Sequence, residues 1–222
     1  MNRRLKLQGL TLLLLLAAGW GLLLAWPTPA YAADPISYWK LNETSGGSYD
    51  NFYSGSHTGT CAGNCPTPAA GQISGGQQFN GTITGINVPA HPDFDWGANQ
   101  TFSIEFWVKG TAGQTCAAAN EVVVGRTDNS SNLLWSLGCS AGTGYARFHL
   151  GDGGTSVTLE STTPITDGNW HHVVGLREAG TNRLYVDGQE VANSVIDYSN
   201  GFTSTAALNI GWLNTGGGIY FD

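Results

Sequence analysis

Aromatic and polar side chains alternate in two short segments of this sequence. In the segment TFSIEFWVKG, Glu105 and Trp107 fall on the polar side of a period-two pattern, and in YARFHL, Tyr145, Arg147 and His149 alternate with apolar residues. A sugar has apolar C–H faces and a rim of hydroxyl groups, so it binds to an exposed aromatic plane beside hydrogen-bonding side chains. If the two strands are neighbours in one sheet, the five residues form a platform for a carbohydrate or a peptide. The alternative is that a loop or the edge of the fold covers Trp107.

Acidic residues are not paired in the way that glycoside hydrolysis requires. Retaining glycosidases need two carboxyl groups about 5 Å apart, which a strand supplies from acidic residues at i and i+2 or i+4. Glu105 has Ser103 and Trp107 at those positions, whereas Asp93 and Asp95 lie in the loop-like segment HPDFDWG. The motifs of serine hydrolases, zinc proteases and phosphate-binding loops are also missing from the sequence. The sequence therefore predicts a protein that is not an enzyme.

The four cysteines favour disulfide bonds, as in exported chains. Three pairings are open, and the sequence-local one, Cys61–Cys65 with Cys116–Cys139, is preferred. The second bond is expected to contribute on the order of 3 kcal/mol to stability. The alternative at the first pair is a zinc site, but the spacing is C-x3-C rather than C-x2-C and only His57 lies nearby.

Residues 1–32 have the pattern of a secretory signal peptide. Arg3, Arg4 and Lys6 precede an apolar run over residues 10–26, and the segment AYA at 30–32 fits a cleavage site. Cleavage there leaves a single domain, residues 33–222, so the protein is expected to be secreted or at the cell surface. The alternative is an uncleaved anchor, because about 17 apolar residues is the lower limit for a membrane span.

The composition favours an all-β fold with many turns. Glycine supplies 32 of the 222 residues and charged residues only 11%, which suits neither long helices nor a disordered chain. Removing the signal peptide leaves six cations against sixteen anions, a net charge of −10. Such a surface repels phosphate backbones, so nucleic acid is not an expected partner.

From residue 34 onward, apolar residues recur with period two between turn signals. Asp187-Gly188 between two such runs predicts a two-residue hairpin. Further strands are expected at Ile36–Leu41, Ile83–Val88, Glu121–Arg126, Leu133–Leu137, Tyr145–Leu150, Ser156–Glu160 and Ala207–Trp212. Four tryptophans fall on the sides expected to face the core, namely Trp39, Trp135, Trp170 and Trp212. Many short strands without crossover helices predict two packed antiparallel sheets, a sandwich or jelly roll.

Several blocks in order resemble one family. They are ISYWKLNETSG, DNFYSGSHTG, GGQQFNG, FSIEFWVKG, DGNWHHVVGLREAGTNRLYVDGQEV and LNIGW. Together they resemble the laminin G-like domains of bacterial exported proteins, within the concanavalin A-like lectin/glucanase jelly rolls. The resemblance runs from about Ile36 onward and implies a two-sheet antiparallel β-sandwich. Family members finish with one further strand, and because this sequence stops at GGGIYFD, the domain is expected to lack it.

The resemblance also implies a structural calcium ion. Related jelly rolls hold calcium near the first loop, where Asp50 occupies the suggested position and Asn51 is adjacent. Calcium needs six to eight oxygen ligands, so backbone carbonyls must complete the set. The alternative is that Asp50 only begins a turn.

The expected function is that of a non-catalytic extracellular binding module. The favoured ligand is carbohydrate, either a polysaccharide or the glycan of a glycoprotein. One alternative is a protein-interaction, adhesion or structural module of a larger cell-surface protein. A second is an accessory domain of a glycoside hydrolase or another secreted enzyme. Membership of a fold does not choose between them.

Overall fold

The computed structural model describes residues 35–53, 55–61, 63–215 and 218–222. They fall within the unit Pro35–Asp222. The predicted signal peptide, residues 1–32, lies outside the described residues. Over the described ranges, no helix has the length and apolar character needed to cross a membrane.

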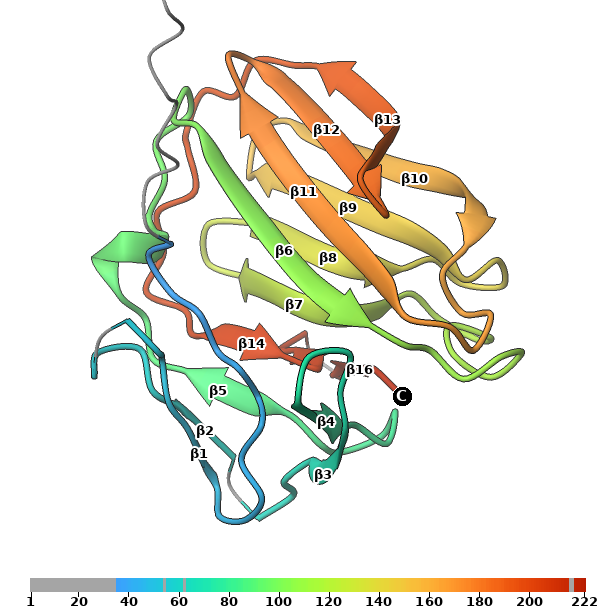
Figure 1. Cartoon of the computed structure of the whole chain (residues 1–222). Coiled ribbons are helices and arrows are strands. Elements are labelled where there is room, and N and C mark those ends of the chain that lie inside the picture. The colour runs from blue at the N-terminus through green and yellow to red at the C-terminus, as the bar shows by residue number, and fades with distance from the viewer. Residues whose placement is uncertain (1–34, 54, 62, 216–217) are drawn as a thin grey trace, which may run out of the picture. The chain divides into compact units, whose positions relative to one another are not determined.

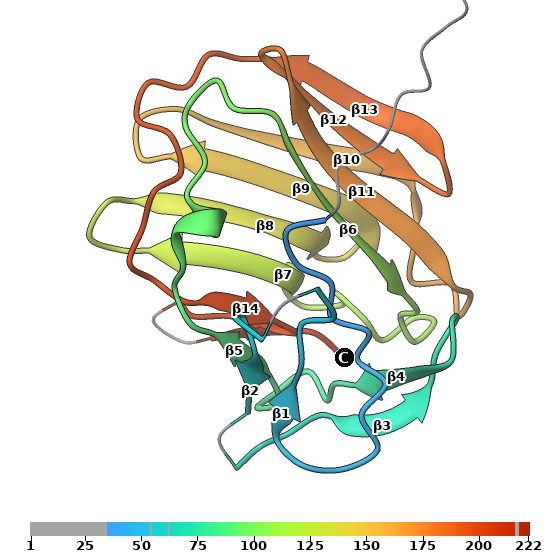
Figure 2. The same ribbon diagram turned by 60° about the vertical axis from the view of Figure 1, so that its left-hand side comes forward.

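Two antiparallel sheets form the body of this unit and lie face to face (Figures 1 and 2). The larger sheet has the strand order β1 (Ser48–Tyr49), β2 (Gly59–Thr60), β5 (Ile86–Val88), β14 (Leu208–Ile210), β7 (Glu121–Asp128), β8 (Leu133–Cys139), β9 (Tyr145–Asp152) and β10 (Ser156–Pro164). The smaller sheet has the order β13 (Gln189–Val195), β12 (Thr181–Val186), β11 (His171–Glu178) and β6 (Phe102–Val108). The expected two-sheet antiparallel β-sandwich is confirmed.

Short elements complete the fold at its margins. Strands β3 (Thr67–Ala70) and β4 (Gly75–Gln78) pair with each other, and β15 (Trp212–Leu213) pairs with β16 (Ile219–Tyr220). One short 3-10 helix, η1 (Pro92–Phe94), lies in the connection between β5 and β6. No longer helix occurs in the part of the chain that the structure describes.

Alternation along the strands determines which side chains fill the core. On β9, Ala146, Phe148 and Leu150 are fully buried, while the residues between them face the other way. Gly175 of β11 approaches the ring of Phe148 so closely that a Cβ atom would lie 3.0 Å from it. The core side of β9 therefore packs directly against the core side of β11.

The Asp187-Gly188 hairpin between β12 and β13 is confirmed. Both residues have positive φ, 51° at Asp187 and 79° at Gly188. Two successive positive φ values are typical of the type I′ turn, whose twist matches that of the flanking strands.

One expected strand is absent, and the four tryptophans expected to face the core are buried to different degrees. Ile36–Leu41 does not form a strand, because only an isolated bridge joins Trp39 to Asn51. Of the four tryptophans expected in the core, only Trp135 is fully buried. Trp39 is half-buried and packs against the core, and Trp170 and Trp212 are half-buried.

A buried cation ties three parts of the chain together. The side chain of Arg126 on β7 is fully buried and donates from Nη1 to Asp95 Oδ1 at 2.7 Å and to the Phe94 carbonyl at 3.0 Å. It also donates to the carbonyls of Ala206, at 2.8 Å, and of Ser204. One guanidinium therefore holds β7, the end of η1 and the segment before β14.

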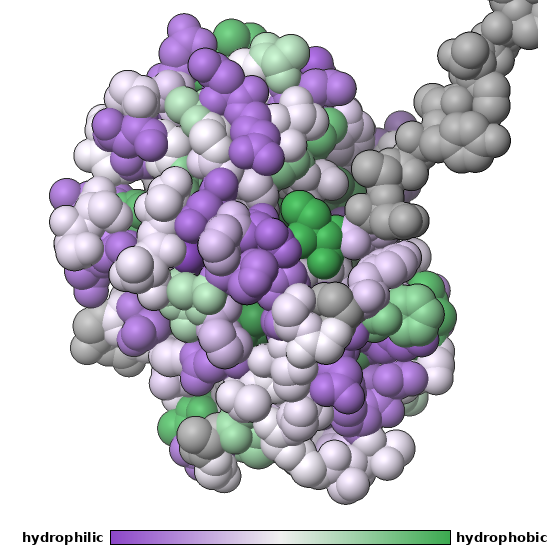
Figure 3. Space-filling view, turned by 90° about the vertical axis from the view of Figure 1, so that its left-hand side faces the viewer, coloured by the Kyte–Doolittle hydropathy of each residue, from purple (hydrophilic) through white to green (hydrophobic). Residues whose placement is uncertain are grey.

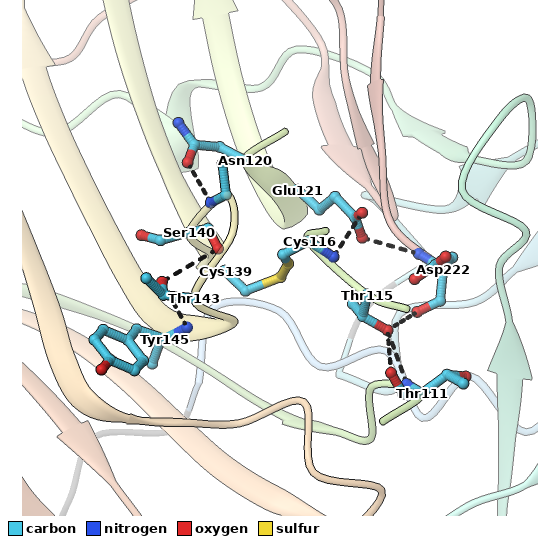
Figure 4. Close-up of a disulfide and its surroundings, with 12 residues drawn as sticks. Thr111, Thr115, Cys116, Asn120, Glu121, Cys139, Ser140, Thr143, Tyr145 and Asp222 are labelled. Atoms are coloured by element: carbon cyan, nitrogen blue, oxygen red, sulfur yellow. Dashed lines mark hydrogen bonds between the residues drawn. A yellow bond between two sulfur atoms is a disulfide. The ribbon is translucent and has the colours of Figure 1, made fainter. Parts of the chain in front are cut away.

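Both predicted disulfides are confirmed. Cys61 is bonded to Cys65, and Cys116 to Cys139. Figure 4 shows the second bond, which links the connection between β6 and β7 to the end of β8. Because these thiols are oxidised, they cannot serve as thiolate ligands, and the zinc alternative at Cys61 and Cys65 is excluded.

A partly buried carboxylate lies beside this disulfide (Figure 4). Glu121 accepts hydrogen bonds from the backbone N–H of Cys116 at 2.7 Å and of Asp222 at 3.4 Å. Burial raises the pKa of Glu121 to about 7, the hydrogen bond from Cys116 opposes this rise, and the charge of Asp222 adds to it. Because the folded-state pKa is raised, the protonated carboxyl contributes stability that is fully present below the ordinary pKa of 4.5.

We expect that contribution to be lost as the pH rises to about 7. Glu121→Gln removes the titrating group while keeping its size. Urea unfolding should then show a free energy of unfolding that falls less steeply across this window in the variant than in the parent chain. If the free energy of unfolding depends on pH in the same way in both proteins, the raised pKa of Glu121 is contradicted.

Candidate functional site

The outer face of the smaller sheet carries an exposed aromatic side chain. On β6, Phe102 and Val108 are buried toward the core, which turns Glu105 and Trp107 outward. Trp107 is 42% exposed, so neither a loop nor the edge of the sandwich covers it in the described structure. Its indole presents an apolar plane to solvent from a rigid strand.

Polar groups border this plane because of the strand register. His172 of β11 lies opposite Trp107, and the two ring centroids are 5.1 Å apart. His172 Nε2 lies 3.4 Å from Glu105 Oε2. An apolar ring, an imidazole and a carboxylate therefore meet on one side of two adjacent strands.

The same outer surface continues across β12 and β13. Val174 lies opposite Glu105, Tyr185 opposite Val174, and Glu190 opposite Tyr185. We name this surface the Trp107 face, defined by Glu105, Trp107, His172, Val174, Tyr185 and Glu190.

Hydrogen bonds hold the carboxylate at the far end of the Trp107 face. Glu190 accepts from Asn193 Nδ2 at 2.7 Å, from Arg183 Nη1 at 2.8 Å and from the Tyr185 hydroxyl at 3.2 Å. The bonds from Asn193 and Arg183 are the main reason that the pKa of Glu190 is lowered. Glu190 is therefore ionised at neutral pH and positioned as an acceptor.

The structure does not bring the five predicted ligand-binding residues together. Tyr145, Arg147 and His149 are on β9 of the larger sheet, and their outward side is opposite to the core side that packs on β11. Glu105 and Trp107 are on the outer side of the other sheet. The hydrophobic core separates the two sets, so they cannot form one platform.

The outward residues of β9 make local contacts of their own. Arg147 Nε lies 3.9 Å from Glu160 Oε1, and His149 Nδ1 lies 2.9 Å from the Thr158 hydroxyl. Burial, followed by the positive charge of Arg147, lowers the pKa of His149 to about 4. Around neutral pH this histidine is therefore neutral.

The predicted calcium ligands fit an ion only in part. Asp50 is exposed, whereas Asn51 is buried. Asn51 Oδ1 accepts from the backbone N–H of Tyr38 at 2.8 Å and of Tyr53 at 3.4 Å, so this oxygen already serves the loop. Of Asp50 and Asn51, Asp50 is therefore the residue whose side chain is better placed to supply a calcium ligand. The calcium site stays a prediction.

The acidic residues considered for catalysis interact with different partners. Asp95 is bonded to Arg126 and to the backbone N–H of Ser204. Asp93 lies beside two histidines, His57 and His91. On the Trp107 face, Glu105 and Glu190 are three strand spacings apart, about 14 Å. A retaining glycosidase needs about 5 Å, so these two do not form such a pair.

Sequence reasoning missed four members of the Trp107 face, namely His172, Val174, Tyr185 and Glu190. The alternation in NWHHVVGLRE places His172 on one side of its strand, and the Asp187-Gly188 turn places Tyr185 near Glu190. What was missing was the pairing of β11 with β6, which joins residues far apart in sequence.

The two packed antiparallel sheets define the class of concanavalin A-like β-sandwich domains. A laminin G family model, described as concanavalin A-like lectin/glucanases superfamily, matches residues 80–222. The chain belongs to this family, which confirms the resemblance seen in its sequence.

Solved structures support the same fold. Domain 4 of AbnA, a GH43 extracellular arabinanase from Geobacillus stearothermophilus, in complex with arabinotriose, is similar with a TM-score of 0.56 and 19% identity, covering 78% of this chain and 82% of that one. The binding domain of Paraclostridial Mosquitocidal Protein 1 matches with a TM-score of 0.59 and 13% identity over 73% of this chain. The receptor binding domain of botulinum neurotoxin D matches with 0.56 and 15% identity, also over 73%. The chain covers only 41% of each of these last two structures.

Proposed function

We propose that residues 33–222 form a non-catalytic extracellular binding module whose Trp107 face binds carbohydrate, as a polysaccharide or as the glycan of a glycoprotein. The observation that carries this proposal is the exposed indole of Trp107, which lies beside His172 and Glu105. The pyranose or furanose ring would stack on the indole, and its hydroxyl groups would bond to the imidazole and the carboxylates.

Two further observations support the proposal. The disulfides are typical of proteins that fold in an oxidising compartment, which suits a protein secreted or displayed at the cell surface. The similar arabinanase domain, described in complex with arabinotriose, suggests short chains of neutral sugar as a first class of ligand. Export by residues 1–32 and a calcium ion near Asp50 belong to the same proposal.

A second candidate function is protein binding. Tyr38, Phe52 and Tyr53 form an exposed aromatic cluster with ring centroids 5.3–6.4 Å apart. Their exposed fractions are 41%, 59% and 47%, and Lys40 Nζ lies 3.6 Å from the Phe52 ring centre. Exposed aromatic side chains of this kind are enriched at protein interfaces, so this cluster favours an adhesion role.

Trp107→Ala is expected to abolish most glycan retention. Truncating an aromatic anchor costs about 2 kcal/mol of binding free energy, which corresponds to about 30-fold weaker binding. The measurement is affinity electrophoresis and array binding on immobilised polysaccharides that include arabinan, run in metal-free buffer and again with calcium chloride.

The matched control is Tyr145→Ala, an aromatic truncation on the outer side of the other sheet. It should leave retention unchanged. Loss in Tyr145→Ala with normal binding by Trp107→Ala would transfer the site to the larger sheet. If the parent chain retains no polysaccharide but captures a cell-surface protein, the protein-binding candidate replaces the carbohydrate one.

A further inference from the structure

Three potential metal ligands meet where two loops touch. His57 lies in the connection between β1 and β2, while His91 is the N-cap of η1 and Asp93 lies within η1. One ligand atom from each residue can be chosen so that all three lie within 4.8 Å of one another. The sequence gives no local sign of this cluster, because His57 is far along the chain from the other two residues.

The innermost residue has an unpartnered nitrogen. The side chain of His57 is only 1% exposed, and its Nδ1 lies 2.7 Å from the Ser37 hydroxyl. Its Nε2 is buried and forms no hydrogen bond. Asp93 Oδ2 lies 3.2 Å from this atom, but off the direction that a hydrogen bond needs. A buried nitrogen without a hydrogen bond needs a physical explanation, and a bound ion supplies one.

The hydroxyl of Ser37 can complete the required tautomer. If Nδ1–H of His57 donates to the Ser37 hydroxyl, then Nε2 keeps a free lone pair for an ion. Asn51 Nδ2, at 3.4 Å, is the second polar group near Nδ1. Metal-bound histidines usually donate their second ring N–H to an oxygen in this way.

The distances around Asp93 suit a small tetrahedral ion. Asp93 Oδ2 lies 3.2 Å from His57 Nε2 and 3.3 Å from His91 Nδ1. Zinc bonds of about 2.0–2.1 Å to nitrogen and oxygen give ligand separations of about 3.3 Å. His91 Nδ1 also lies 3.3 Å from the backbone nitrogen of Asp93, a contact that a bound metal would replace.

The donor set distinguishes between metals. Two imidazole nitrogens and one carboxylate are the ligands of zinc and its neighbours in the transition series. Calcium requires six to eight oxygens, which this cluster does not supply. The calcium ion proposed near Asp50 is therefore a separate matter.

Solvent can reach the cluster from one side. The side chains of His91 and Asp93 are 40% and 46% exposed, so an ion could enter past them and reach His57. Figure 1 shows η1 at the left margin of the molecule, and Figure 3 shows that face, which is largely hydrophilic with separate hydrophobic patches.

We propose that His57, His91 and Asp93 bind one divalent transition-metal ion of the zinc type, with water completing its coordination. The ion fastens the connection between β1 and β2 to η1. This role is independent of carbohydrate binding, because none of the three residues belongs to the Trp107 face.

Titration calorimetry of the untagged full chain with zinc chloride tests the site, with calcium chloride as the comparison. We expect one equivalent of zinc to bind, calcium to give no signal at this site, and zinc to raise the thermal unfolding midpoint. His91→Ala and Asp93→Ala should each weaken zinc binding at least about tenfold, because even outer partners of a metal site contribute about 10–100-fold. Both side chains are exposed enough for these variants to fold. His149→Ala, which removes a histidine on the larger sheet, should bind zinc like the parent chain.

Absence of zinc binding by the parent chain would overturn the proposal and leave the cluster as a simple histidine–aspartate contact. Unchanged binding in His91→Ala and Asp93→Ala would also overturn it. Weakening by His149→Ala to the same extent would place the ion elsewhere. Circular dichroism of each variant without metal shows whether a loss of binding reflects the site or the fold.

Discussion

Arg126→Met is expected to lower the free energy of unfolding by about 3–5 kcal/mol, because it removes one partner of a buried ion pair. The guanidinium is fully buried and bonds to Asp95 and to three backbone carbonyls. Methionine fills much of the same volume but donates no hydrogen bond. Asp95 then keeps its charge without its cation, and the carbonyls lose their donors.

Urea unfolding of the parent chain and of three variants measures this effect. Arg126→Lys keeps the charge but cannot reach all four acceptors, so its loss should lie between those of the parent and Arg126→Met. Arg183→Met is the matched control, since Arg183 pairs with Glu190 on the surface at 2.8 Å. Its effect should be much smaller, because surface pairs are screened by solvent. Equal losses for Arg126→Met and Arg183→Met would contradict this account of the buried arginine.

Removal of the Cys116–Cys139 bond has the second largest expected effect. Its cysteines are 23 residues apart, and closing a loop of that length restricts the unfolded chain by about 3 kcal/mol. The Cys61–Cys65 bond spans only 4 residues, for which the same relation gives about 2 kcal/mol. Both Cys116 and Cys139 are fully buried, so the loss of packing around their sulfur atoms adds to the difference.

The two double variants, Cys116→Ala/Cys139→Ala and Cys61→Ala/Cys65→Ala, form a matched pair. Alanine is chosen instead of serine, because a serine hydroxyl would lie in the core without a hydrogen-bond partner. Unfolding in urea, with the free energy extrapolated to water, should rank the parent first, the Cys61/Cys65 variant second and the Cys116/Cys139 variant last. The reverse order of the two variants would show that loop length and burial do not control these bonds.

Much of the fold was predicted correctly from local patterns. The alternation in TFSIEFWVKG places Trp107 on the outside of β6, and the two-residue turn Asp187-Gly188 joins β12 to β13. The sequence-local disulfides formed as expected. Ile36–Leu41 failed because its apolar residues have only a single bridge at Trp39 in place of a strand partner. A pattern of side chains cannot show whether a partner strand exists.

Only part of the candidate site was predicted from the sequence, for a related reason. Alternation correctly turned Tyr145 and Trp107 outward, but it contains no information about which sheet each strand joins. The pairing of β6 with β11 places His172 beside Trp107, and the position of β9 in the other sheet removes Tyr145 from that surface.

The sequence by itself determined most of the strands, the Asp187-Gly188 turn, the preferred disulfide pairing and the family of this protein, because each depends on neighbouring residues or on an ordered set of motifs. The tertiary structure alone decided which side chains share a surface. It joined Trp107 to His172 and Glu105, and it placed His57 beside Asp93. The physical reason is that side-chain alternation is a local property of the backbone, whereas sheet order and loop contacts arise from long-range packing of the whole core.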